Sequence, residues 1–207
     1  MKKLLLAALA AVCLASGASA QDEARQWDPS APYPSDIVIG RADAPVTVVE
    51  YASLTCPHCG RFHKESLEAF TKGWVETGKA KLVYRHLPLD QSALAGALTV
   101  ACVPEERRPA LLKELFASVS EWAPAADLAP PLKRVFGDNV TVDEVISCFS
   151  AKGFAEEVMR PGTDAVNNGV SATPTFFVNG EMHVGFRTAE ELGAAVDGAV
   201  SKALLGE

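Results

Sequence analysis

The chain has no apolar run of the about 20 residues that a membrane-spanning helix requires. An uncharged apolar stretch at residues 4–14 follows Lys2 and Lys3 and precedes small residues at Ala18 and Ala20. This pattern is typical of a secretory signal peptide that is cleaved after Ala20. We therefore expect residues 1–20 to be removed, which leaves 187 of the 207 residues as an exported protein not embedded in a membrane.

The sequence also lacks an excess of positive charge. Its net charge is −7, and without the two leader lysines it becomes −9, because 17 basic and 26 acidic side chains remain. A surface of this sign repels polyanions, so nucleic-acid binding is not expected. The remaining length suits one domain, or one domain that carries an insertion.

Cysteine is scarce, and only one closely spaced pair occurs. Of five cysteines, Cys13 lies in the predicted leader, and Cys56, Cys59, Cys102 and Cys148 remain. An even number in an exported protein favours two disulfides. Cys13 is a weak candidate for lipid attachment, because valine precedes it where a lipoprotein leader needs a small residue.

The first part of the mature chain predicts a β-α-β unit. Residues 21–36 are polar and proline-rich, which indicates a mobile N-terminal arm. Residues 37–89 carry a short apolar piece, two strands rich in β-branched residues, and between them a helix from near Cys56 to before Gly78. Two strands joined by a helix are expected to be parallel, with a right-handed crossover.

The rest of the chain divides into a helical block and a second β-containing part. Residues 90–161 show helical spacing only, with Asp90 as a helix cap and a capping box at 141–144. Residues 162–207 predict a short helix at 164–168, and then a hairpin and a terminal helix. The hairpin strands are expected at 175–178 and 181–186 around Asn179-Gly180, and a second capping box at 188–191 starts the terminal helix.

The chemistry-bearing motif is Cys56-Pro57-His58-Cys59, placed where a strand becomes a helix. A structural disulfide is one interpretation, but such tight loops are seldom used for stability. A zinc half-site is a second, although zinc usually requires two such pairs. The favoured interpretation is a redox-active dithiol, because a C-x-x-C motif beside a β-α-β pattern is typical of one.

The local physics favours an acidic first cysteine. Cys56 lies at a helix N-terminus, where free backbone N–H groups and the helix dipole stabilise an anion. Pro57 suits the first helical turn, and a protonated His58 would add positive charge. Each factor lowers the pKa of Cys56, and a low pKa favours the dithiol over the disulfide, as in an oxidant of other proteins.

With these features together, the sequence resembles the DsbA-like branch of the thioredoxin superfamily, the exported thiol–disulfide oxidoreductases. The motif matches the family's dithiol, and Glu50 matches the acidic residue buried beneath it. Residues 172–180 resemble the cis-proline loop and its hairpin, and the helical block matches the family's insertion. The resemblance implies an α/β fold: a thioredoxin fold with an all-helical insertion between its two halves.

The resemblance also assigns roles to residues. Cys56 is the exposed nucleophile and Cys59 the buried resolving cysteine. Pro174 is cis and faces the dithiol, so that the Thr173 backbone is presented to an incoming unfolded peptide. Glu50 exchanges a proton with Cys59.

Two features leave the direction of electron flow open. Thr173 stands where the best-known oxidases have valine, and threonine there is more like the isomerase and reductase relatives. Those relatives are oligomers built through an N-terminal module, and residues 21–35 are too short and too polar for one, so a monomeric oxidase is favoured.

Some relatives carry a second disulfide in the helical block. This implies a Cys102–Cys148 bridge, with two buried free thiols as the alternative.

The resemblance implies partners but no cofactor or metal. The expected clients are unfolded or partly folded exported proteins with free cysteines, and a membrane redox partner resets the dithiol in the periplasm. A copper-tolerance or other metal-handling thiol protein and a non-catalytic interaction domain are the competing functions. His63, His86 and His183 are expected to be solvated or packed, whereas Tyr51, Phe176 and Phe177 could line an apolar groove or the core.

Overall fold

The structure is a computed structural model that describes residues 27–125, 133–135 and 141–205. The predicted signal peptide and the first residues of the arm lie outside this part of the chain. Within the described ranges, no helix is both long and apolar enough to cross a membrane.

A five-stranded sheet forms the centre of the fold. Its strands are β1 (Ile37–Ile39), β2 (Val46–Ala52), β3 (Ala80–His86), β4 (Thr175–Val178) and β5 (Glu181–Val184). They lie in the order β1-β3-β2-β4-β5. β2 and β3 are parallel, as the β-α-β prediction requires, whereas β1, β4 and β5 pair antiparallel with their neighbours. The β4–β5 turn is the predicted hairpin, although β5 ends at Val184 and not at 186.

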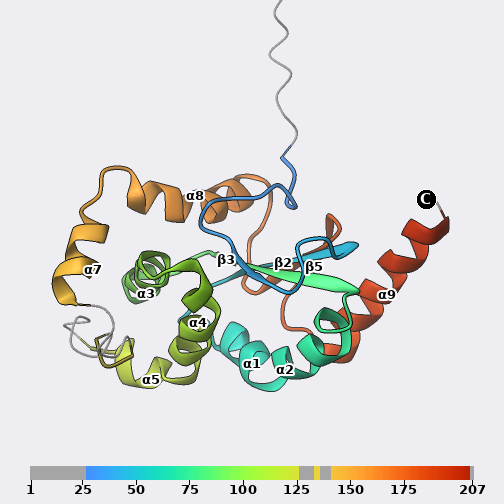
Figure 1. The fold of residues 1–207 in the computed structure, drawn as a ribbon, viewed down its shortest axis with the longest axis horizontal. Helices are drawn as coiled ribbons and strands as arrows, with labels where there is room; N and C mark the ends of the chain where they lie inside the picture. The colour runs from blue at the N-terminus through green and yellow to red at the C-terminus, as the bar shows by residue number, and fades with distance from the viewer. Residues whose placement is uncertain (1–26, 126–132, 136–140, 206–207) are drawn as a thin grey trace, which may run out of the picture.

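Helices cover both faces of the sheet and form a lobe beside it (Figure 1). They are α1 (Pro57–Glu65), α2 (Leu67–Phe70), the π-helical turn η1 (Thr71–Val75), α3 (Gln91–Cys102), the 3-10 turn η2 (Glu105–Arg107), α4 (Arg108–Ala117), α5 (Val119–Trp122), α7 (Val142–Phe149), α8 (Phe154–Asn167) and α9 (Ala189–Leu205). α1, α2 and α9 lie against one face, with α8 on the other. α3, α4, α5 and α7 form the lobe. This is a thioredoxin fold with a helical insertion between its halves, as the sequence predicted.

Side chains along β2 alternate between two hydrophobic cores, one on each face of the sheet. Val46 and Val48 pack with Phe62 of α1 and Val196 of α9, and Val49 points to the opposite face. Period-two alternation then places Glu50 on the face that α1 covers. The strand therefore brings an acidic side chain beneath the helix that carries the two cysteines.

Several helices start where the sequence predicts, because a helix start depends on residues that are close together in the sequence. The Asp90 carboxylate accepts the Ala93 N–H at 2.8 Å and caps α3. The capping box of Thr141 and Glu144 starts α7. The Thr188 hydroxyl likewise accepts a backbone N–H at the start of α9. The helix predicted between Cys56 and Gly78 is present, but as α1, α2 and η1 in succession.

The short helix predicted at 164–168 is present as the C-terminal end of a longer helix, so only its predicted start is wrong. α8 begins at Phe154 and runs through Pro161 and Gly162, so it crosses residue 161, where the helical block was expected to end. Proline removes one backbone hydrogen bond, yet Pro161 is buried and the helix continues. Gly162 allows a close approach to β3, since a Cβ there would lie 2.8 Å from the carbonyl oxygen of His86.

The described part of the N-terminal arm, which the sequence predicted to be mobile, contacts a buried arginine in the structure. The Arg85 guanidinium of β3 donates to both carboxylate oxygens of Asp36, at 2.7 and 2.9 Å. It also donates to the Pro29 carbonyl at 2.7 Å. Trp27 packs against the rings of Tyr51 and Phe177. A buried guanidinium needs several acceptors, and residues 27–36 supply them.

Candidate active site

Cys56 lies at the N-terminus of α1. It is the N-cap residue, with extended backbone angles of φ −73° and ψ 122°, and Pro57 follows in the first turn. Its carbonyl accepts the Gly60 N–H at 2.9 Å, and its own N–H donates to Ser53 at 3.1 Å. The cysteine therefore sits where the first N–H groups of the helix have no partner within the helix.

The pKa of Cys56 falls from 9.0 to about 5. The largest cause is a hydrogen bond from the Cys59 thiol, and the Thr173 side chain and the backbone N–H groups of Cys59 and His58 add to it, while burial opposes it. His58 acts here through its backbone, and its ring is exposed. The low pKa of Cys56 agrees with the sequence prediction, and its main causes are hydrogen bonds.

Cys56 is less exposed than the sequence analysis expected. Its relative exposure is 7%, because it packs within the cluster formed with the helical insertion. The cis-proline loop also approaches it, and the Cys56 thiol donates to the Thr173 carbonyl oxygen at 3.3 Å. The exposed residues of the motif are Pro57 and His58.

Cys59 has the opposite character. It is fully buried, and its pKa is raised, first by burial, then by its hydrogen bond to Cys56 and by the negative charge of Glu50. Both thiols are free in the structure. One sulfur is thus poised as a thiolate and the other as a thiol, which is the asymmetry that disulfide exchange requires.

The loop before β4 faces the dithiol. The Thr173–Pro174 peptide bond is cis, and Pro174 is buried. Both residues come from the second β-containing half of the chain, more than 100 positions after the motif, as the 117-residue separation of the Cys56–Thr173 hydrogen bond records. The fold brings the two sequence motifs together.

Glu50 is completely buried on β2, and its partner is a residue to which the sequence analysis gave little weight. His63 Nε2 lies 3.1 Å from Glu50 Oε2, and the His63 side chain is only 3% exposed. His63 lies four residues after Cys59, one helical turn along α1. That spacing puts Cys59 and His63 on one helix face and could have placed His63 near the dithiol, although not beside Glu50.

The second pair of cysteines forms a disulfide. Cys102 at the end of α3 and Cys148 in α7 are bonded, with Cα atoms 5.9 Å apart. The bridge lies within the helical insertion and ties two of its helices together. Two buried free thiols, the alternative weighed from the sequence, are not present.

The remaining candidates are structural. Tyr51, Phe176 and Phe177 are buried in the two sheet cores. His86 is buried, and its pKa falls to about 3, mainly through burial and then through the charge of Arg108, so it is neutral at physiological pH. In the described part of the chain, no group of three or more His, Cys, Asp and Glu side chains could hold a metal ion.

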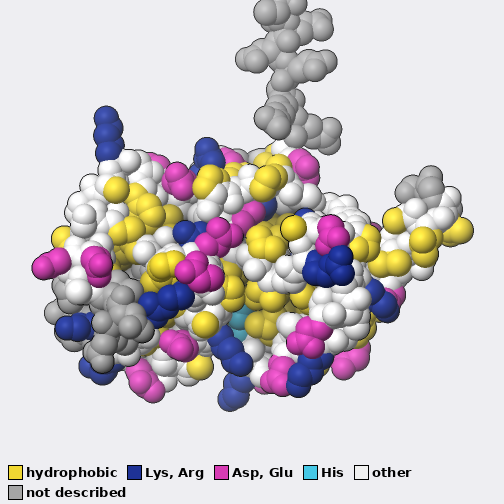
Figure 2. All heavy atoms as spheres, viewed as in Figure 1, with side chains coloured by type: hydrophobic (Ala, Val, Ile, Leu, Met, Phe, Trp, Pro, Cys, Tyr) yellow, Lys and Arg dark blue, Asp and Glu magenta, His cyan; other side chains and the backbone are white. Residues whose placement is uncertain are grey.

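An exposed leucine lies near the motif. Leu89 is 59% exposed, and its N–H donates to the Ser53 hydroxyl. The next residue, Asp90, accepts a hydrogen bond from Thr55 at 2.6 Å, and Thr55 precedes Cys56. The β3–α3 loop, which carries this exposed apolar side chain, therefore contacts the residues that precede Cys56. On the face drawn in Figure 2, acidic and basic side chains are interspersed with hydrophobic ones.

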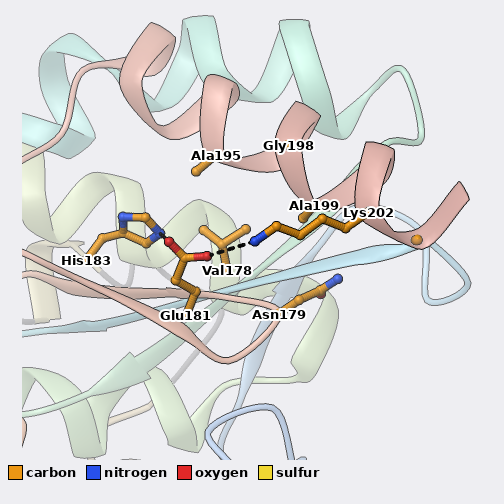
Figure 3. Close-up of a pocket in the computed structure, with 9 residues that line it drawn as sticks. Val178, Asn179, Glu181, His183, Ala195, Gly198, Ala199 and Lys202 are labelled. Carbon is orange, nitrogen blue, oxygen red and sulfur yellow. Dashed lines mark ion pairs between the residues drawn. The ribbon is translucent and has the colours of Figure 1, made fainter. Parts of the chain in front are cut away.

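A separate cavity lies between the β4–β5 hairpin and α9 (Figure 3). Its volume is about 410 Å³, and Glu181 in it pairs with Lys202 at 3.6 Å and with His183 at 3.9 Å. Val178 lines it at the end of β4 remote from Pro174. No residue of the dithiol site lines this cavity.

Comparisons with known proteins agree with this geometry. A family model described as thioredoxin matches residues 33–198. The crystal structure of α-DsbA1 from Wolbachia pipientis superimposes with a TM-score of 0.75 and is 28% identical, covering 84% of this chain and 96% of that one.

Two curated relatives are longer than this chain. The Na+/H+ antiporter NhaA 3 of Salinispora tropica is 33% identical over 82% of this chain, which spans only 26% of the antiporter. A Rickettsia bellii protein named "Putative protein-disulfide oxidoreductase" is 25% identical over 81% of this chain and 66% of its own length. The chain therefore belongs to the thioredoxin family, and its fold is similar to that of a DsbA protein.

Proposed function

We propose that the chain exchanges a Cys56–Cys59 disulfide with the cysteines of other proteins and acts mainly as a disulfide donor. The observation that carries the proposal is the position of the Cys56 sulfur, at the N-terminus of α1 and 3.3 Å from the Thr173 carbonyl oxygen. A client thiol that reaches this sulfur would lie along the cis-proline loop, where its backbone could pair with an extended segment.

The exchange has two steps. A client thiolate attacks Cys56 Sγ of the disulfide form, the Cys56–Cys59 bond breaks, and Cys59 leaves with the electron pair and takes up a proton. A second client thiolate then attacks the client sulfur of the mixed disulfide, and Cys56 leaves as a thiolate. The client is oxidised by two electrons and the dithiol of this chain is formed.

The low pKa of Cys56 favours this direction. A folded-state pKa of about 5 stabilises the dithiol form by about 3 kcal/mol at pH 7. That corresponds to a reduction potential raised by about 60 mV. Glu50, next to Cys59, is the group proposed to supply the proton. Leu89, which is 59% exposed on the loop after β3, is proposed to give the client an apolar contact.

Export fits this chemistry. We propose that residues 1–20 direct the chain to the periplasm, and the Cys102–Cys148 bridge agrees with an oxidising compartment. The proposed partners are exported proteins with free cysteines and a membrane redox protein. We expect the mature protein to begin at Gln21 and to be a monomer. The mass of its chain tests the first point, and the mass of the particle in solution tests the second.

Oxidative refolding of a reduced, unfolded client tests the activity. The disulfide form should restore client activity stoichiometrically, and Cys56→Ser should abolish it. Cys59→Ser should accumulate a mixed disulfide between Cys56 and the client. Absence of both refolding and trapped adduct would overturn the proposal, whereas insulin reduction without client oxidation would favour the isomerase or reductase alternative.

A further inference from the structure

The buried acid beneath the dithiol is paired with an imidazole. Glu50 is fully buried and His63 is 3% exposed, so neither group is solvated by bulk water. A buried carboxylate is costly unless a partner compensates its charge. His63 Nε2, 3.1 Å from Glu50 Oε2, is the ion-pair partner of Glu50 within the described residues.

The pair carries unused hydrogen-bonding capacity. Glu50 Oε1 and His63 Nδ1 are both buried and have no hydrogen-bond partner among the residues that the structure describes. Unsatisfied buried polar atoms are rare in native structures, and a functional role is one explanation of them. An imidazole can also take up or release a proton in the physiological range, which a fixed amide or hydroxyl partner cannot do.

The surroundings hold the ring in place and isolate it. Phe116 of α4 stacks on His63 with a ring separation of 3.9 Å and an interplanar angle of 23°. Tyr84 of β3 and Phe62 of α1 meet it edge-on, each at 5.7 Å. The helical insertion and the thioredoxin core thus both contact the imidazole.

In the described ranges, the titratable groups around the pair are few. Cys59 lies on α1 and Tyr84 on β3, and the negative charge of Glu50 contributes to keeping both protonated. The Cys56 thiolate is a further negative charge near the pair, and it also raises the pKa of Cys59 and of Tyr84. Tyr84 is engaged with the Ala52 carbonyl oxygen. Cys59 is therefore the group left to exchange a proton with the pair.

We propose that His63 is a positioning residue of the dithiol site, which holds the Glu50 carboxylate through Nε2 and shares with it the proton that Cys59 takes up when the disulfide opens. The proposal rests on the disulfide exchange described above. It adds a named source for the proton and a reason for an imidazole at this position.

Opening of the disulfide moves one proton within the site. When the Cys56–Cys59 bond breaks, Cys59 Sγ keeps the electron pair and carries one negative charge. One proton then passes from the Glu50–His63 pair to Cys59, so the negative charge moves to the carboxylate and the sulfur becomes a thiol. On reoxidation Cys59 returns this proton as its thiolate attacks the mixed disulfide at Cys56.

The test combines two substitutions of His63 with a matched control. His63→Leu removes the partner of Glu50, and His63→Gln keeps an amide donor that does not titrate. His183→Gln, in the cavity of Figure 3, removes a histidine remote from the dithiol. The rate of disulfide transfer to a dithiol peptide is measured as a function of pH for each protein.

We expect His63→Leu to slow the transfer by about tenfold or more and to change its pH profile. His63→Gln should recover part of the rate without restoring the wild-type profile, and His183→Gln should match wild type. A folded His63→Leu protein with the wild-type rate and profile would overturn the proposal. If wild type itself transfers no disulfide, the exchange function fails instead.

A spectroscopic measurement covers the case in which His63→Leu does not fold. The nitrogen chemical shifts of the His63 ring are followed against pH in the oxidised and reduced wild-type protein and in Glu50→Gln. The shifts should differ between the two redox states, and Glu50→Gln should abolish the difference. Identical shifts in both redox states would contradict a shared proton.

Discussion

The Cys56 sulfur lies 3.3 Å from the carbonyl oxygen of Thr173, although 117 positions separate the two residues. One comes from the β-α-β half of the fold and the other from the hairpin half. The sheet order β1-β3-β2-β4-β5 sets β4 beside β2 and so brings the two motifs to one end of the sheet. The redox site therefore exists only once both halves have folded together.

The reduced protein should lose stability as the pH falls. The folded pKa of Cys56, about 5, lies below its unfolded value of 9.0, so the stabilisation is fully present above pH 9 and is lost as the pH falls through about 5. Denaturant unfolding of the reduced and oxidised forms should show the reduced form favoured near neutral pH. Cys56→Ser, which has no thiol at this position, should remove the pH dependence of the reduced form. An equal stability of the reduced and oxidised wild-type forms at pH 7 would contradict the prediction.

Loss of the second disulfide should destabilise the helical insertion. The bridge closes a loop of 46 residues, which corresponds to about 4 kcal/mol in the loop-entropy model. The double substitution Cys102→Ala and Cys148→Ala should lower the urea midpoint accordingly. An unchanged midpoint would mean that the bridge adds nothing to folding. Cys56 and Cys59 stay intact in this variant, so the dithiol titration serves as its internal control.

Close packing of α8 on β3 should make Gly162 intolerant of a methyl group. A Cβ there would meet the His86 carbonyl at 2.8 Å and the Leu87 Cα at 3.2 Å. We expect Gly162→Ala to destabilise the protein by about 1–3 kcal/mol. Gly198→Ala, a helical glycine of α9 with open space around its Cβ, is the control and should be neutral or slightly stabilising. Equal effects of the two would refute the packing argument.

Removal of the buried arginine should release the N-terminal segment. Arg85→Met leaves Asp36 buried without its partner and should cost about 3–5 kcal/mol. Limited proteolysis should then cleave within residues 27–36, which the wild-type protein protects. Arg85→Met combined with Asp36→Leu should recover part of the stability, because no unpaired charge remains. A protected segment in Arg85→Met would show that Trp27 packing alone holds it.

The predictable parts of the fold are those set by neighbouring residues. The Asn179-Gly180 turn depends on two residues that accept positive φ, here 45° and 89°. The Asp90 cap acts over three positions. The dithiol motif and the cis-proline loop are likewise short patterns, so the resemblance to a family could be read from them.

The parts that were missed depend on contacts across the sheet. The Glu50–His63 pair joins β2 to α1, and Arg85 reaches 49 positions back to Asp36. Neither pairing leaves a pattern in adjacent residues. The continuation of α8 through Pro161 depends on packing against β3, which local propensity does not include. The burial of Cys56 depends on the helical insertion that packs around it.

The reduction potential of the Cys56–Cys59 couple, equilibrated with glutathione at pH 7, tests the central claim most directly. A disulfide donor should lie well above the about −270 mV of thioredoxin, toward the oxidising end near about −120 mV. A potential at or below that of thioredoxin would contradict the account, because the Cys56 thiolate would then not favour the dithiol form.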